Sequence, residues 1–238
     1  MIIQACLNGA RQREFHPRLP VTAEEIAAAA AACVRAGAGE IHVHCRRPDG
    51  RESLAAVDAV VPLLRRACPG TLIGVSTGAW IEGDEARTLA AIGAWQALPD
   101  HASVNLSEPG APAVMECLRS RGVAVEAGLA SAADAERFAA LAGRERVLRV
   151  LVEIEAEQEA AAAREACDAI LAVLRREGVS RPILLHGFDA TVWPLARLAL
   201  ERGWSTRVGL EDGDRLPDGT VAPDNAALVA AAVALRAE

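Results

Sequence analysis

The stretch Glu40-Ile41-His42-Val43-His44 has the composition of a short buried strand, and it stands between two apolar stretches, residues 23–36 and 54–67, that have helical composition. The same alternation of strand and helix repeats along the chain, without a linker or a change in composition. Eight such pairs predict one α/β domain over residues 1–238, a single (β/α)8 barrel or TIM barrel. A doubly wound open sheet shares the alternation and is the alternative, but the count of eight favours the barrel.

The expected elements follow from short β-rich runs and from alanine-rich runs between them. The strands are expected at residues 2–7, 40–44, 72–76, 102–106, 123–127, 147–153, 182–186 and 207–211. The helices are expected at residues 23–36, 54–67, 82–95, 111–121, 132–141, 155–177, 191–202 and 225–236. Thr22 followed by Glu25 forms a capping box that marks the start of the first helix.

Polar side chains stand at the carboxyl ends of most expected strands. They are Asn8, His44, Ser76, Asn105, Glu126, His186 and Glu211. In a barrel, all of these strand ends meet at one mouth, and that mouth is where barrel active sites lie.

His42 and His44 are the strongest indication of chemistry in the chain. Side chains alternate along a strand, so both imidazoles point to the same face about 7 Å apart along the backbone. Two histidines on one face are suitable ligands for a divalent metal such as zinc. The alternative is that one histidine is solvated at the strand end and the other is hydrogen-bonded in the core.

A catalytic zinc bound by two histidines needs a third protein ligand. The carboxylates near strand ends are Glu126, Glu153, Glu155, Glu211 and Asp212. Glu211 is the best placed, because the eighth strand of a closed barrel lies beside the first and near the second. Arg207 is expected on the same strand face as Glu211, where it pairs with a carboxylate or binds an anionic substrate. The alternative is a structural ion pair with Asp212 as a helix cap.

The side chains expected to contact substrate are Ser76, Asn105, Glu126 and His186. Hydroxyl and amide groups at strand ends can hold a substrate carboxylate, but strand-to-helix turns use them as caps equally often. His186 is expected as a residue of the barrel mouth. No G-x-S-x-G motif accompanies it, so a serine hydrolase triad is disfavoured.

Composition excludes several classes of function. The chain has a net charge of -7 and no lysine, so Schiff-base and pyridoxal phosphate chemistry are excluded. The absence of long basic runs disfavours nucleic acid and anionic membranes as partners. We expect a cytoplasmic protein, because no signal peptide or membrane span is visible and the six cysteines form no C-x-x-C motif.

Several stretches resemble the β-keto acid cleavage enzyme family, the group related to 3-keto-5-aminohexanoate cleavage enzyme. They are Leu19-Pro20-Val21-Thr22-Ala23-Glu24-Glu25-Ile26, Ala36-Gly37-Ala38, Ile41-His42-Val43-His44, Arg47-Pro48-Asp49-Gly50, Ser76-Thr77-Gly78, Arg207-Val208-Gly209-Leu210-Glu211-Asp212, Leu216-Pro217-Asp218-Gly219 and Asn225-Ala226. Together these stretches extend over most of the chain.

The resemblance implies a (β/α)8 barrel that holds zinc through His42, His44 and Glu211, with Asp212 as the general base and Arg207 as its partner. It also implies that a β-keto acid loses a proton, that the resulting enolate attacks acetyl-CoA, and that a retro-Claisen step releases acetoacetate and a new acyl-CoA. The expected partners are therefore a small anionic β-keto acid and acetyl-CoA, and we expect a homo-oligomer.

Two other functions are compatible with the residues. A metal-dependent barrel hydrolase would use zinc-bound water as its nucleophile and would need no acetyl-CoA. A non-catalytic metal-binding barrel would keep only the scaffold.

Overall fold

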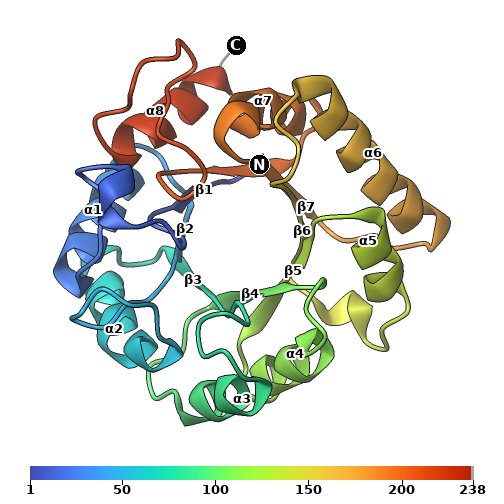
Figure 1. Cartoon of the computed structure of the whole chain (residues 1–238), viewed down its shortest axis with the longest axis horizontal. Helices are drawn as coiled ribbons and strands as arrows, with labels where there is room; N and C mark the ends of the chain where they lie inside the picture. The colour runs from blue at the N-terminus through green and yellow to red at the C-terminus, as the bar shows by residue number, and fades with distance from the viewer. Residues whose placement is uncertain (237–238) are drawn as a thin grey trace.

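The computed structural model describes residues 1–236, and in them eight parallel strands close into a barrel in the order β1 to β8. Figure 1 shows this ring end-on, with the helices around it. The strands are β1 (Ile3–Cys6), β2 (Glu40–Val43), β3 (Leu72–Ser76), β4 (His101–Asn105), β5 (Ala124–Leu129), β6 (Arg149–Ile154), β7 (Ile183–Gly187) and β8 (Ser205–Val208). The prediction of a TIM barrel is confirmed.

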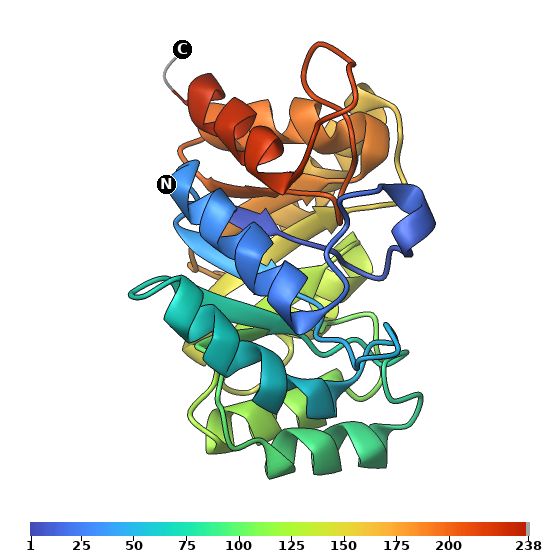
Figure 2. The ribbon, with the colours of Figure 1, turned by 90° about the vertical axis from the view of Figure 1, so that its left-hand side faces the viewer.

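An α-helix follows each strand and covers the outside of the barrel, as Figures 1 and 2 show. The helices are α1 (Ala23–Arg35), α2 (Val57–Ala67), α3 (Glu85–Ala94), α4 (Ala111–Ser120), α5 (Ala132–Ala139), α6 (Ala160–Arg176), α7 (Val192–Glu201) and α8 (Asn225–Leu235). The predicted capping box is present, because the Thr22 hydroxyl accepts from the Glu25 amide and the Glu25 carboxylate accepts from the Thr22 amide.

Outward-facing strand residues form the core between the barrel and the helices. In β2, Ile41 and Val43 are fully buried among apolar side chains, and the intervening His42 points into the barrel. The period of two along each strand therefore separates an apolar outer layer from a polar interior.

Two strands differ from their expected bounds in ways that affect the site. β5 continues to Leu129, so Glu126 lies in the middle of the strand and not at its carboxyl end. β8 ends at Val208, and Glu211 lies on a turn in which the Asp212 amide donates to the Gly209 carbonyl at 3.0 Å. Gly209 permits this turn, since a Cβ there would lie 1.8 Å from the Cys6 carbonyl oxygen.

A buried ionic layer fills the barrel interior below the strand ends. The Arg149 guanidinium donates to Glu126 at 2.6 Å and also to both carboxylate oxygens of Glu40. Gln4 donates to Glu40 at 3.3 Å and contacts the His101 ring at 3.3 Å. One arginine from β6 thus joins carboxylates from β2 and β5 across the barrel.

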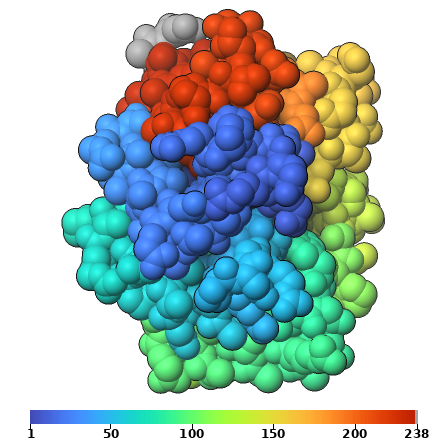
Figure 3. Space-filling model, turned by 60° about the vertical axis from the view of Figure 1, so that its left-hand side comes forward, coloured from blue at the N-terminus to red at the C-terminus, as the bar shows by residue number. Residues whose placement is uncertain are grey.

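The loop after β1 and the segment after β8 lie side by side. The His16 ring contacts the Ala222 carbonyl at 3.0 Å, and Figure 3 shows the blue surface of the N-terminal segment beside the red surface of the C-terminal one. Among the helices of residues 1–236, none combines the length and the apolar character needed to cross a bilayer.

Replacing Arg149 by Met should lower the free energy of unfolding by about 3–5 kcal/mol, because Glu40 and Glu126 would be left buried without a counter-charge. Urea unfolding measures the change. The control is Arg164→Met, which removes an exposed pair with Glu201 at 3.5 Å and should change stability by less than about 1 kcal/mol. Equal effects in the two variants would show that the ionic layer does not stabilise the barrel.

Glu126 should make stability depend on pH. Burial alone would raise its pKa, but the Arg149 guanidinium, with smaller contributions from His101 and His42, lowers the pKa to about 2 from the usual 4.5. A carboxylate with a depressed pKa contributes stability above its unfolded pKa and loses that contribution as pH falls toward the folded pKa. The stability difference between wild type and Glu126→Gln should therefore shrink below about pH 4.5. A difference that stays constant from pH 7 to pH 3 in urea unfolding would contradict this.

Candidate active site

Three side chains from opposite ends of the chain converge at the barrel mouth. His42 Nε2 lies 3.7 Å and His44 Nε2 lies 3.6 Å from Glu211 Oε1, and all three ligand atoms lie within 4.8 Å of one another. Two ligands that each lie about 2.1 Å from a tetrahedral zinc are themselves about 3.4 Å apart. The spacing of these three side chains is therefore suitable for one metal ion.

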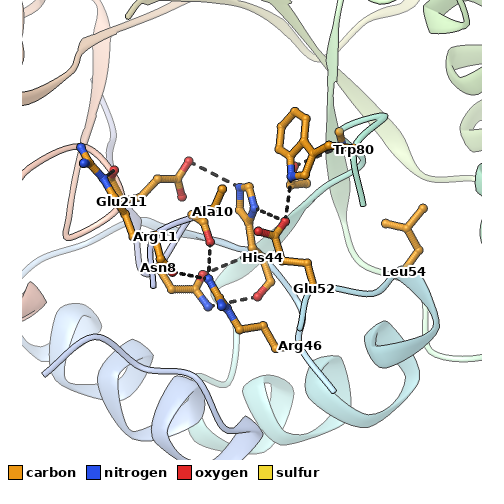
Figure 4. A network of polar contacts seen from close by, with 12 residues as sticks. Asn8, Ala10, Arg11, His44, Arg46, Glu52, Leu54, Trp80 and Glu211 are labelled. Carbon is orange, nitrogen blue, oxygen red and sulfur yellow. Dashed lines mark hydrogen bonds and ion pairs between the residues drawn. The ribbon is translucent and has the colours of Figure 1, made fainter. Parts of the chain in front are cut away.

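His44 is held in place by its backbone and by its ring. The Asn8 side chain accepts from the His44 amide at 3.0 Å and donates to the His44 carbonyl at 3.0 Å. Glu52 lies 3.0 Å from His44 Nδ1, which leaves Nε2 directed toward Glu211 (Figure 4). A carboxylate on the second ring nitrogen is the usual partner of a metal-bound histidine. Trp80 completes this support. Its indole N–H donates to the Glu52 carboxylate at 3.1 Å, and its ring stacks on the His44 ring with 6.2 Å between the ring centroids.

The two histidines of the cluster have pKa values shifted in opposite directions. Burial lowers the pKa of His42 to about 3, so this ring is neutral and has a free nitrogen lone pair. Burial would also lower the pKa of His44, but the Glu211 and Glu52 carboxylates outweigh it and raise the pKa to about 9. Glu211 is buried, yet the Arg207 guanidinium and the two histidines hold its pKa well below its usual range.

The residues of the cluster also fit a metal chemically. Two imidazoles and one carboxylate are a common ligand set of catalytic zinc, which keeps one position open for substrate. Glu211 Oε2 is buried and has no hydrogen-bond partner among the described residues. Such an orphaned carboxylate oxygen is costly in a folded protein unless a cation is its partner.

Glu211 takes its position from the turn after β8 and not from a strand. The expectation that Arg207 and Glu211 share one strand face is wrong, because β8 ends at Val208 and the chain turns at Gly209. Arg207 nevertheless donates to Glu211 Oε1 at 2.7 Å, because its long side chain reaches up from β8. Gly9 leaves room on the other side, since a Cβ there would lie 2.5 Å from Glu211 Cγ.

Asp212 lies behind this cluster and is fully buried. The Cys6 thiol donates to its Oδ2 at 2.6 Å, and burial keeps Cys6 a thiol by raising its pKa well above the usual value. The other oxygen of Asp212, Oδ1, lies 3.3 Å from His186 Nδ1 and 3.5 Å from the Arg207 guanidinium. It has no hydrogen-bond partner among the described residues. Burial and Arg207 would lower the pKa of His186, but Asp212 and Glu153 raise it to about 9.

A cavity of about 270 Å³ opens above the cluster. Its lining includes His42, His44, Ser76, Asn105, Arg207 and Glu211. Ser76 and Asn105 therefore lie where substrate contacts were expected. His186 does not line the cavity, because its ring is buried between Asp212 and Glu153. The expected position of Glu126 is wrong, since this residue lies deeper, paired with Arg149.

Several supporting residues carry no signal in the sequence. Glu52 lies in the same loop as His44, and an antiparallel bridge between Arg46 and Glu52 folds that loop back, whereas Trp80 comes from the loop after the neighbouring strand β3. Arg46 joins the first two loops by donating to the carbonyls of Gly9 and Arg11, both at 2.7 Å (Figure 4). Arg11 lines the cavity and donates to Asp189 at 2.7 Å.

Solved structures with the same fold include ObcA. The apo structure of ObcA superposes with a TM-score of 0.70 at 20% sequence identity, and the match covers 90% of this chain and 61% of that one. The binary complex of ObcA with oxaloacetate gives a TM-score of 0.71 at the same identity, with 90% and 62% covered. At this identity the likeness concerns the barrel fold.

Curated relatives match at the level of sequence. A 3-keto-5-aminohexanoate cleavage enzyme of Acetoanaerobium sticklandii is 38% identical over 81 residues, which is 33% of this chain and only 30% of that protein. A 3-oxoadipate:acetyl-CoA acetyltransferase of Cupriavidus necator is 27% identical over 252 aligned residues, covering 98% of this chain and 87% of that protein.

A family model agrees with these relatives along the full length of the chain. The model is that of the beta-keto acid cleavage enzymes, and it matches residues 1–238. The chain belongs to the beta-keto acid cleavage enzyme family.

Proposed function

We propose that the protein is a zinc-dependent β-keto acid cleavage enzyme. It condenses a small β-keto acid with acetyl-CoA and cleaves the adduct by a retro-Claisen step to acetoacetate and a new acyl-CoA. The observation that carries this proposal is the convergence of His42, His44 and Glu211 on one point at the cavity, in a chain of this family. The names of the relatives support it, since one includes a β-keto acid and acetyl-CoA together.

His42, His44 and Glu211 would hold the metal. A bound zinc supplies Lewis-acid chemistry that lowers the cost of negative charge on substrate oxygens, a task that no lysine is available to perform in this chain. Arg207 contributes a second positive charge at the same wall, because it lines the cavity and is buried beside Glu211. The Ser76 hydroxyl also lines the cavity and would donate to the substrate carboxylate.

Asp212 acts as the general base in this proposal and takes a proton from the carbon between the ketone and the carboxylate. Its unpartnered Oδ1 is the atom available to receive that proton. Cys6 fixes the other oxygen, and His186 lies 3.3 Å from Oδ1. A carboxylate held on several sides loses little orientational freedom before proton transfer, which favours catalysis.

The purified protein should contain one zinc per chain, and His42→Ala and His44→Ala should each lose most of it on dialysis, because two ligands cannot hold zinc tightly. Elemental analysis by mass spectrometry measures the metal. His16→Ala is the control, since His16 lies outside the cluster and contacts Ala222. Full metal content in both cluster variants would place the metal elsewhere.

Asp212→Asn should lower kcat by about 10²–10⁴-fold, because the amide keeps the size of the side chain and removes the proton acceptor. Zinc content and melting temperature should stay near the wild-type values. Asp214→Asn is the matched control, since Asp214 is partly exposed and pairs with Arg215. An Asp212→Asn variant within about tenfold of wild type would show that another group takes the proton.

A further inference from the structure

One residue in the loop after β7 has a backbone conformation for which the rest of the chain uses glycine. Asp189 has a φ of 46°, and the ten other residues of the described chain with positive φ are all glycines. Glycine adopts this left-handed conformation without strain, whereas an aspartate does not. The Asp189 side chain is 54% exposed, so packing in the core does not require it. The contacts of its own amide and carboxylate must therefore explain why an aspartate is present.

Asp189 holds the turn that carries Glu211 and Asp212. Its amide donates to the Asp212 carbonyl at 2.7 Å. Its carboxylate accepts from Arg11 at 2.7 Å, and the same guanidinium donates through Nε to the Glu211 carbonyl at 3.2 Å. The backbone carbonyls of both site residues are thus held from the loop after β7, one directly and one through Arg11.

The Arg11 guanidinium is also held by two aromatic rings. It lies 4.2 Å from the centroid of the Phe15 ring and 5.7 Å from that of Phe188, the residue before Asp189. A planar cation that contacts two rings and a carboxylate has few other orientations available. Arg11 can therefore transmit the position of the loop after β7 to the turn after β8.

The loop after β7 is fixed on both sides of Asp189. The buried Thr191 hydroxyl accepts from the Phe188 amide at 3.1 Å and donates to the Phe188 carbonyl at 2.9 Å. The Gln158 side chain accepts from the Ala190 amide at 3.1 Å. A strained backbone persists only where its surroundings determine it, and such positions are concentrated at functional sites.

Glu211 depends on such outside contacts because it lies beyond the end of β8. Its amide is 3.4 Å from the Cys6 carbonyl, which is a long hydrogen bond. Asp189 itself is not part of the cavity lining, whereas Arg11 and Glu211 are. Any effect of Asp189 on the site must therefore act through the residues that it holds.

We propose that Asp189 is a positioning residue for the metal site. Its carboxylate acts through Arg11 to keep the turn of Glu211 where the Glu211 carboxylate meets His42 and His44. The inference rests on the proposed function, which makes Glu211 a zinc ligand. An ordinary exposed ion pair would have no such effect.

Zinc affinity tests the proposal, measured without substrate by competition with a chromophoric chelator. Asp189→Gly should bind zinc about 10-fold more weakly than wild type, as is typical when a residue that orients a metal ligand is lost. The melting temperature of the metal-free variant should equal or exceed that of wild type, because glycine relieves the left-handed backbone. Wild-type zinc affinity in Asp189→Gly overturns the proposal.

Asp189→Asn is the conservative variant. Asparagine tolerates a positive φ, and its amide oxygen can still accept from Arg11, so its zinc affinity should lie between those of wild type and Asp189→Gly. An Asp189→Asn variant that binds zinc no better than Asp189→Gly overturns the role of the contact with Arg11.

Asp168→Asn is the matched control for loss of an aspartate–arginine pair. Asp168 lies 2.8 Å from Arg202 with side-chain exposures of 48% and 26%, and the pair of Asp189 with Arg11 has exposures of 54% and 26%. The control should keep wild-type zinc affinity. A loss equal to that in Asp189→Gly would show a general effect of charge and overturn the proposal.

A double-mutant cycle tests the route through Arg11. Arg11→Met should also weaken zinc binding, and the double variant Arg11→Met/Asp189→Gly should bind zinc no more weakly than Arg11→Met alone. Residues that act through one another show this non-additivity. Additive losses overturn the route.

Hydrogen exchange of the metal-free protein follows the turn itself. The amides of Asp212 and Gly213 donate to the Gly209 carbonyl at 3.0 and 3.1 Å, and they should exchange faster in Asp189→Gly than in wild type. Unchanged exchange together with weaker zinc binding would overturn the turn as the cause.

Product analysis of wild type separates this inference from the proposed function. It uses acetyl-CoA and a panel of β-keto acids with anionic, neutral and cationic side groups. Weaker zinc binding by Asp189→Gly, without acetoacetate from any acid in wild type, supports the positioning role and contradicts the cleavage activity. Acetoacetate formation with equal zinc affinities in the two proteins supports the activity and overturns the positioning role. A wild type that binds no zinc overturns both.

Discussion

The pairing of β8 with β1 is the interaction on which the site depends. Gln4 is in register with Arg207 on one side of β1, and Cys6 is in register with His42 on the other. One strand thus lies between the two sequence regions that supply the cluster. In an open sheet with the same strand order, β8 would lie six strand spacings from β2, which carries His42, roughly 29 Å away. Closure of the barrel converts this separation into the 3.7 Å between His42 and Glu211.

The barrel interior contains two polar layers with different kinds of contact. In the lower layer, Arg149 donates directly to Glu126 at 2.6 Å, so opposite charges are paired within the protein. In the upper layer, the two histidines lie 3.6 and 3.7 Å from Glu211, too far for hydrogen bonds and suitably spaced for an ion between them. The lower layer therefore has its charges paired within the protein, and the upper layer leaves the two histidines and Glu211 spaced for the proposed metal.

The two sides of the upper layer carry different side chains. Arg207 and the histidines lie on the side of β2 and β8, whereas Glu153 and Glu155 lie on the side of β6. The loops after β2 and β3 support the side of the histidines, where Glu52 fixes the His44 ring.

The sequence by itself determined the barrel and indicated the residues of the proposed metal site. Regular alternation of strands and helices is a local property, and a histidine pair with a spacing of two residues must share one strand face. Resemblance to the family then identified Glu211 together with the histidines. Local pattern was less reliable at strand ends. It placed Glu126 at the mouth, because nothing in the sequence shows that β5 continues to Leu129.

Only the tertiary structure decided which side chains act on one another across the barrel. The contacts of Trp80 with His44, of Cys6 with Asp212 and of Arg149 with Glu40 join residues on different elements. They depend on register, on barrel closure and on the room that a glycine leaves, and these are properties of packing that no local pattern encodes. The sequence determined which side chains face inward, because side chains alternate between the two faces of a strand. The closed barrel determined which of these side chains meet, because closure sets the distances between strands.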